Sequence, residues 1–262
     1  MGPMTNRLSH RDLLLPKEHG GWSLAFEPVA LGLLVAPSAA GAVLALAAVT
    51  GFFTRRPLKF ALSLPTADPR RGPARRWAAL FSLLTLTLLA GAAGLGSTRA
   101  LWPLLLAAPL GGLFLWFDLR HAMREAEAEL AGSTAFALLP AACATLAGWP
   151  APAALALAAL AVARNVPTVL TVRTCLRLGK AQATNALLPL AAGGAAFAVA
   201  ALLAWQGLVP AAAVAVHAVF WIRTGWLVSA LRPAWPARQV GVMEAVLGGL
   251  QLGVLAAAYH WR

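Results

Sequence analysis

The basic residues of this 262-residue chain fall almost entirely on alternate connections between long apolar segments. All 21 Lys and Arg residues except Arg99 and Arg262 belong to one set of connections. An apolar helix of roughly 20 residues crosses a bilayer, and positive charge stays on the cytoplasmic side. The pattern therefore predicts a multi-pass membrane protein with its N-terminus in the cytoplasm and, for an odd number of spans, its C-terminus outside.

Composition supports this class, because 60% of the residues are hydrophobic, only 11% are charged, and the mean hydropathy is +0.73. Soluble domains carry about 25% charged residues. Pro, Gly and short polar stretches divide the chain into nine predicted spans: 22–37, 39–54, 77–96, 100–117, 132–148, 151–170, 184–206, 208–230 and 240–259. We expect an all-α bundle of about nine transmembrane helices.

This bundle is expected to form a single transmembrane domain over residues 1–262. In the expected topology residues 1–21 are a cytoplasmic N-terminal segment, and residues 55–76 and 118–131 are cytoplasmic loops.

The net charge of +12 has the same origin as the alternation. Basic residues beside membrane spans are attracted by anionic lipid headgroups. The expected partners are therefore the bilayer and its anionic headgroups, and nucleic acid is not an expected partner. Cys143 and Cys175 show neither CxxC spacing nor a histidine at ligand spacing, so packing is their simplest role.

The segment before the first span brings together Lys17, Glu18 and His19, followed by two glycines. It is either a membrane-anchoring entry or a functional group of cation, anion and imidazole at the headgroup level. Glu27 lies inside the first span. An ionisable residue there costs about 2.5–3.5 kcal/mol, so it should face the bundle and have a partner.

Two groups of cations follow predicted spans. Arg55, Arg56 and Lys59 come after the second span and are predicted to converge on a phosphate or carboxylate. Arg164 lies near the end of the sixth span, where an arginine is costly unless it meets an anion. With Arg173 it forms the predicted anion-binding pair.

Residues 118–130 read as a short amphipathic interfacial helix. Glu125 and Glu129 stand one turn apart on it and are candidates to coordinate a hard cation.

The last two spans carry four buried polar candidates. His217 is either a hydrogen-bonded core histidine or part of a site. Arg223 and Glu244 are predicted partners across the two helices. Glu244 and Gln251 are seven residues apart and share the face that should point inward.

Three motifs carry a family resemblance: Pro-Lys-Glu-His-Gly-Gly-Trp at 16–22, Arg-Arg-Pro-Leu-Lys at 55–59 and Glu-Leu-Ala-Gly-Ser at 129–133. With these motifs the chain resembles, over essentially its whole length, the YwiC-like family of bacterial polytopic membrane proteins. The resemblance implies a bacterial cytoplasmic membrane. It implies no particular reaction.

The chain is also similar, more loosely, to the UbiA superfamily of membrane prenyltransferases. Those proteins have nine transmembrane helices and a cytoplasmic active site built from the loops after the second and sixth spans. The superfamily's Asp-rich motifs are absent here, where the first loop has only Asp68 and the second has no acid between Arg164 and Lys180. A UbiA-like transferase activity and a divalent-cation cofactor therefore stay open.

The favoured hypothesis is a UbiA-like bundle that binds or transforms an anionic amphiphile, such as an isoprenoid phosphate, in a polar cavity facing the cytoplasm. The predicted substrate-binding residues are Lys17, Arg55, Arg56, Lys59, Arg164, Arg173, His217 and Arg223. The predicted acid–base or metal-ligating residues are Glu18, His19, Glu27, Glu129 and Glu244.

Two alternatives remain. A small-anion transporter would line its path with the same arginines, and Glu27 and His217 would carry protons. A non-catalytic subunit or assembly factor of a respiratory complex would need no open cavity. It predicts that Arg164 pairs with Glu27 or with a partner subunit.

Overall fold

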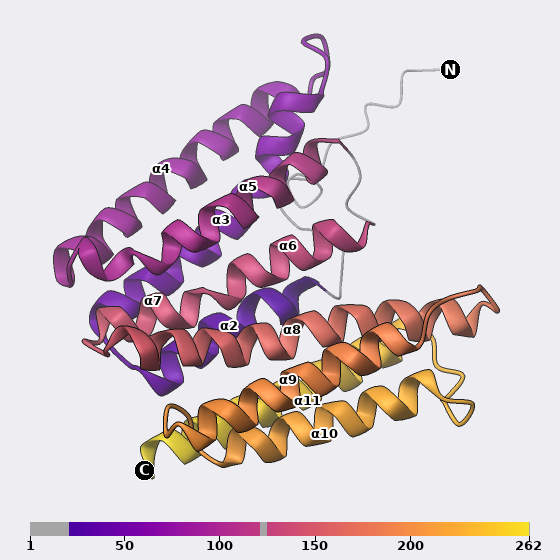
Figure 1. Ribbon diagram of the computed structural model, residues 1–262. Coiled ribbons are helices and arrows are strands. Elements are labelled where there is room, and N and C mark those ends of the chain that lie inside the picture. Colours follow the sequence, from indigo (N-terminus) through magenta and orange to yellow (C-terminus); the bar gives the residue numbers. More distant parts are fainter. Residues whose placement is uncertain (1–20, 121–124, 262) are drawn as a thin grey trace, which may run out of the picture.

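The computed structural model describes residues 21–120 and 125–261, which fold into helices and connections without a strand in those ranges (Figure 1). The α-helices are α2 (Gly21–Val35), α3 (Ala39–Ser63), α4 (Arg71–Leu95), α5 (Pro103–Leu119), α6 (Ala126–Ala137), α7 (Leu139–Leu146), α8 (Ala151–Gly179), α9 (Leu187–Trp205), α10 (Ala212–Val228) and α11 (Ala237–His260). With α6 and α7 counted as one interrupted span, helices stand at all nine predicted positions. The prediction of an all-helical membrane bundle is confirmed.

The apolar character of these helices suits a bilayer. Five stretches are long and apolar enough to cross it, namely α4, residues 126–146 across α6 and α7, α8, α9 and α11. Residues 22–35, α5 and α10 are shorter apolar helices. Large side chains such as Leu83, Leu105 and Ile222 lie 65%, 75% and 72% exposed on the bundle surface, where lipid tails would cover them. The chain is a multi-pass integral membrane protein.

The helices form two groups with a central layer between them (Figure 1). In the first group α3 and α4 pack along each other, with α5 nearby. In the second group α8, α9 and α10 pack together with α11. Helices α2, α6 and α7 lie between the groups, and α2 packs against α11, so that the first and last described helices are neighbours.

Several helices run beyond their predicted ends. Residues 55–63 belong to α3 and residues 71–76 to α4, so the predicted loop 55–76 is only the connection 64–70. The prediction failed because Arg and Lys side chains reach headgroup level from a helix that continues past the hydrocarbon core. For the same reason α8 continues through Pro167 to Gly179 and carries Arg173.

The predicted interfacial helix 118–130 is also wrong. Residues 118 and 119 are the end of α5, and residues 126–131 are the beginning of α6. Both ends of the predicted loop 118–131 therefore belong to neighbouring helices. Residues 121–124 lie outside the described part of the chain.

The basic connections gather at one end of the bundle. The α3–α4 connection lies at the top of Figure 1 and the α8–α9 and α10–α11 connections at its right, whereas the α4–α5, α7–α8 and α9–α10 connections lie at the left with the C-terminus. The charge alternation in the sequence is therefore a difference between the two ends of the molecule. Which end faces the cytoplasm stays a prediction.

A close approach of α2 and α7 at Gly32 generates a test of the packing. A Cβ on Gly32 would lie 2.9 Å from Cys143 Cβ and 3.1 Å from the backbone Cα of Pro140. We expect Gly32→Ala to lower the free energy of unfolding by about 1–3 kcal/mol, because backbone atoms cannot move aside cheaply. Thermal unfolding in detergent, followed by tryptophan fluorescence, measures the change.

The matched control is Gly253→Ala on α11, where a Cβ meets nothing within 4 Å. Wild-type stability in both variants would contradict the described contact between α2 and α7.

Candidate functional site

Four charged side chains from four helices meet inside the bundle. They are Glu27 on α2, Arg164 on α8, Arg223 on α10 and Glu244 on α11, and we call them the central charge cluster. Arg164, Arg223 and Glu244 are only 3%, 6% and 5% exposed. Segments far apart in the sequence thus converge on one site.

Ion pairs connect the cluster. Oε2 of Glu244 lies 3.0 Å from Nη2 of Arg223 and 3.3 Å from Nη1 of Arg164. Arg164 Nη2 lies 3.6 Å from Glu27 Oε2 and also donates to the backbone carbonyl of Glu244 at 3.0 Å. The predicted pairing of Arg223 with Glu244 is confirmed. Two cations and two carboxylates make the cluster neutral, as burial in a membrane requires.

Two neighbours of the arginines were not singled out from the sequence. The hydroxyl of Thr168 accepts hydrogen bonds from Arg164 and, at 3.1 Å, from Arg223, and donates to the Arg164 carbonyl at 2.7 Å. The ring of Phe220 lies 4.3 Å from Arg164 Cζ and 5.3 Å from Arg223 Cζ. A cation over an aromatic face is stabilised when desolvated. The contact between Arg164 and Thr168 could have been predicted, because residues four apart on a helix lie side by side.

Several buried polar atoms around the cluster have no hydrogen-bond partner. The donors are Nε of Arg164 and both Nε and Nη1 of Arg223. The acceptors are Glu244 Oε1, Asn165 Oδ1 and Gln251 Oε1. Buried polar groups are nearly always paired, so a group of exceptions in one place calls for a partner such as a bound water or an ion.

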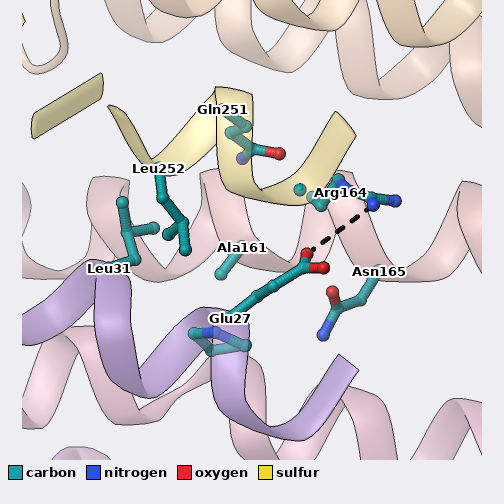
Figure 2. A pocket seen from close by; sticks show the side chains of 9 residues that line it. Glu27, Leu31, Ala161, Arg164, Asn165, Gln251 and Leu252 are labelled. Atoms are coloured by element: carbon teal, nitrogen blue, oxygen red, sulfur yellow. Dashed lines mark ion pairs between the residues drawn. The ribbon is translucent and has the colours of Figure 1, made fainter. Parts of the chain in front are cut away.

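A cavity adjoins the cluster beside Glu27. Its lining residues are Glu27, Pro28, Leu31, Ala161, Arg164, Asn165, Gly248, Gln251 and Leu252. The space in it that is open to a water-sized molecule is about 10 Å³, room for roughly one water and far below the roughly 300–1,000 Å³ of pockets for larger organic ligands. Figure 2 shows the Glu27 carboxylate reaching from α2 toward Arg164, with Asn165 beside it and Gln251 on α11 above.

Gly248 makes room for that carboxylate, because a Cβ at this position would overlap the Glu27 carboxyl group. The sequence suggested only close helix packing for this glycine. The structure shows that the close neighbour is a charged side chain.

The cations on α3 bind a carboxylate of the protein itself. Arg55 Nε and Lys59 Nζ lie 2.6 and 2.8 Å from the two oxygens of Asp118, which is buried at the end of α5. Arg55 Cζ also lies 4.7 Å from the centre of the Phe114 ring. The predicted convergence on an anion therefore holds for Arg55 and Lys59, but the anion is Asp118.

Arg56 points elsewhere: its Cζ lies 5.5 Å from the centre of the Phe60 ring.

The predicted anion-binding pair of Arg164 and Arg173 does not form one site. Arg173 Nη1 lies 3.0 Å from Glu129 Oε2, whereas Arg164 binds Glu27 and Glu244. Nine residues on one helix separate two side chains by roughly 13.5 Å along the axis, too far for one small anion to bridge.

The remaining predicted site residues fall in three places. His217 is 1% exposed, and its Nδ1 donates to the carbonyl of Ala213 at 2.8 Å, as expected of a core histidine. Glu129 lies on α6 away from the cluster, and the part of the chain that the structure describes holds no group of three or more His, Cys, Asp or Glu suited to a metal ion. Lys17, Glu18 and His19 lie outside the described residues.

Asp68, the lone acid of the α3–α4 connection, is engaged locally. Arg70 Nη2 lies 2.7 Å from Asp68 Oδ2, and the hydrogen bonds from Arg70 hold the pKa of this carboxyl below its usual value. Asp68 is thus part of a local ion pair in the loop.

The fold and the buried cluster define a multi-pass membrane protein with a polar site enclosed by its helices. Residues 15–144 match the family model described as YwiC-like protein. This half of the chain belongs to the YwiC-like family, which confirms the resemblance there. The matched range contains Glu27, and the other three members of the cluster lie beyond it. No curated protein and no solved structure matches the chain, and a UbiA-like fold stays a prediction.

The double contact of Glu244 with two arginines generates a stability test. Glu244→Gln leaves Arg223 buried without a counter-ion, and removing one partner of a buried pair costs about 3–5 kcal/mol. We expect loss of folded protein, measured by size-exclusion chromatography and thermal unfolding in detergent.

The double variant Arg223→Met/Glu244→Met removes both charges and leaves Arg164 paired with Glu27. The double variant should recover most of the stability that Glu244→Gln loses. A double variant less stable than Glu244→Gln would show that the ion pair is not what makes the single change costly.

The adjacent glycines of α11 offer a second test. Gly248→Ala should displace the Glu27 carboxylate from Arg164 and lower the melting temperature, whereas a Cβ at Gly249 meets nothing within 4 Å. Alanine also favours a helix over glycine by about 1 kcal/mol, so Gly249→Ala should be neutral or stabilising. Equal melting temperatures for the two variants would be inconsistent with the described position of Glu27.

Proposed function

We propose that this integral membrane protein binds a small anion at Arg164 and Arg223 and carries it across the membrane. The observation that carries the proposal is the set of three unpaired N–H donors on these two arginines, which are buried inside the bundle of apolar helices. A small anion would accept hydrogen bonds from these donors, and charge-assisted bonds to guanidinium groups are among the strongest in proteins.

The neutral state of the cluster supports a transport role. Glu27 and Glu244 balance the arginines when no anion is bound, so the site need not expose unpaired charge to the hydrocarbon core. Buried ionisable groups facing the interior of a bundle commonly mark ion pathways.

An anionic amphiphile, the hypothesis favoured by the sequence, fits the geometry less well. Arg55, Lys59 and Arg173 engage Asp118 and Glu129 rather than a shared cavity. The cavity beside Glu27 is also small for an isoprenoid chain. The proposal therefore places a small anion at the cluster and leaves lipids around the bundle.

For the surroundings we propose a bacterial cytoplasmic membrane, with the N-terminus inside and the C-terminus outside. The gathering of the basic connections at one end of the bundle supports this orientation. The basic residues at that end would contact anionic headgroups.

A second candidate function has one specific observation in its favour. A non-catalytic subunit or assembly factor predicts that Arg164 pairs with Glu27, and these residues lie 3.6 Å apart. In that role the cluster only holds α2, α8, α10 and α11 together. The experiment below separates the two functions.

The test measures flux of formate and chloride into liposomes that contain the purified protein. We expect faster uptake than into protein-free liposomes, lost in Arg223→Gln and strongly reduced in Arg223→Lys, which keeps the charge but not the planar fork. Arg70→Gln, in an exposed loop pair, is the control and should match wild type.

All variants are first checked for folding by size-exclusion chromatography. Folded wild-type protein that moves neither ion faster than protein-free liposomes would overturn the carrier proposal and favour the subunit role.

A further inference from the structure

We propose that Glu27 takes up one proton when the small anion binds at the central charge cluster, so that the two binding events are linked. The inference rests on the proposed function and adds that a proton is bound together with the anion. It follows from the acceptors that line the cavity, the charge balance of the cluster and the different partners of its two glutamates.

The acceptors are the amide oxygens of Asn165 and Gln251. Asn165 Nδ2 donates to the carbonyls of Ser133 at 2.9 Å and Leu24 at 3.3 Å, which fixes the orientation of the amide and leaves Oδ1 without a partner. Gln251 Oε1 is also unpaired, and the two residues are 0% and 5% exposed. Both line the cavity that Glu27 enters (Figure 2).

An ionised carboxylate only accepts hydrogen bonds, so Glu27 in its charged form can bond to neither amide oxygen. A protonated carboxyl has one O–H donor. Only the protonated form of Glu27 can therefore donate a hydrogen bond to the amide oxygens that line the cavity.

Charge balance requires the same proton. The cluster is neutral with both glutamates ionised, and an added anion would leave it with a net negative charge in a medium of low dielectric constant. One proton on Glu27 restores neutrality. By thermodynamic linkage, a proton that favours the anion is in turn favoured by the anion.

Of the two glutamates in the cluster, Glu27 is the better placed to take up the proton. Glu244 Oε2 is held by both arginines at 3.0 and 3.3 Å, whereas Glu27 makes one longer ion pair, 3.6 Å from Arg164. The Glu27 side chain is also more exposed than that of Glu244, 13% against 7%. Protonation of Glu27 thus breaks the weaker contact and leaves Arg164 to the incoming anion.

The charged groups facing Glu27 are Arg164 on α8 and Glu244 on α11, and Ser23 on its own helix donates to it. The other titratable residues on helices packed against α2 have other surroundings. Glu129 pairs with Arg173, Arg55 and Lys59 pair with Asp118, and His260 bonds to the Leu34 carbonyl. Arg56 lies on Phe60, Tyr259 lies against Trp149, Cys143 lies beside Gly32, and Cys175 is buried farther along α8, whereas Glu127, Arg177 and Arg238 are exposed.

The proton step is simple. Glu27 takes up one hydrogen ion from the solution, so that an O–H bond of hydronium breaks and releases water while the carboxyl O–H bond forms. This O–H donates to an amide oxygen of the cavity, and the anion takes the place of the carboxylate as counter-ion to Arg164. Release of the anion reverses the step. No electron transfer or further reactant is involved.

The experiment is isothermal titration calorimetry of formate into the detergent-solubilised protein, in two buffers of different ionisation enthalpy. The difference in heat counts the protons taken up. We expect about one proton per formate where Glu27 is ionised, and formate affinity that weakens about tenfold per pH unit there.

Glu27→Gln cannot titrate, and its amide donor mimics the protonated acid. It should bind formate at least as tightly as wild type, with no proton uptake and no pH dependence. Asp68→Asn, in the exposed α3–α4 connection, should keep the wild-type pH dependence. Because Glu27→Gln keeps the shape of the side chain, it also tests the proposal without emptying the cavity.

The outcomes are distinct. Formate binding without proton uptake in wild type, or unchanged proton uptake in Glu27→Gln, overturns the coupling and leaves the proposed anion site standing. Formate binding that depends on sodium instead of pH would mean that the amide oxygens of Asn165 and Gln251 bind a metal cation. This result would also overturn the coupling to a proton. Absence of formate binding at every pH overturns both the coupling and the anion site.

Discussion

The interaction on which the structure depends is the pairing of Arg164 with carboxylates from two other helices. A guanidinium within a membrane-spanning helix is costly unless an opposite charge meets it. Glu27 from α2 and Glu244 from α11 meet it, and Glu244 also binds Arg223 from α10. These contacts fix the positions of four helices and join the first described helix to the last.

The same contacts leave both donors and acceptors in the site without partners. The unpaired N–H groups lie on the arginines, and the unpaired oxygens lie on Asn165, Gln251 and Glu244. A neutral cluster that has both free donors and free acceptors would suit the proposed ligand, which brings negative charge together with a proton. The proposed anion site would supply partners for these groups, which the internal contacts of the cluster leave unsatisfied.

Much of the fold could be predicted from the sequence, because the membrane restricts the chain to helices and the charge alternation marks their ends. Glu27 and the pair Arg223–Glu244 could be predicted because ionisable residues in spans need partners. The pairing of Arg55 and Lys59 with Asp118 could not, since it depends on how α3 packs near α5. Helix ends were misplaced wherever long basic side chains extend from a helix to headgroup level.

Anomalous X-ray diffraction from crystals grown in bromide tests the central claim most directly, because it locates a small anion by its own signal. The account predicts a bromide peak within hydrogen-bonding distance of the unpaired nitrogens of Arg223 and Arg164. Peaks confined to the surface cations, with the cluster showing only its internal ion pairs, would contradict it.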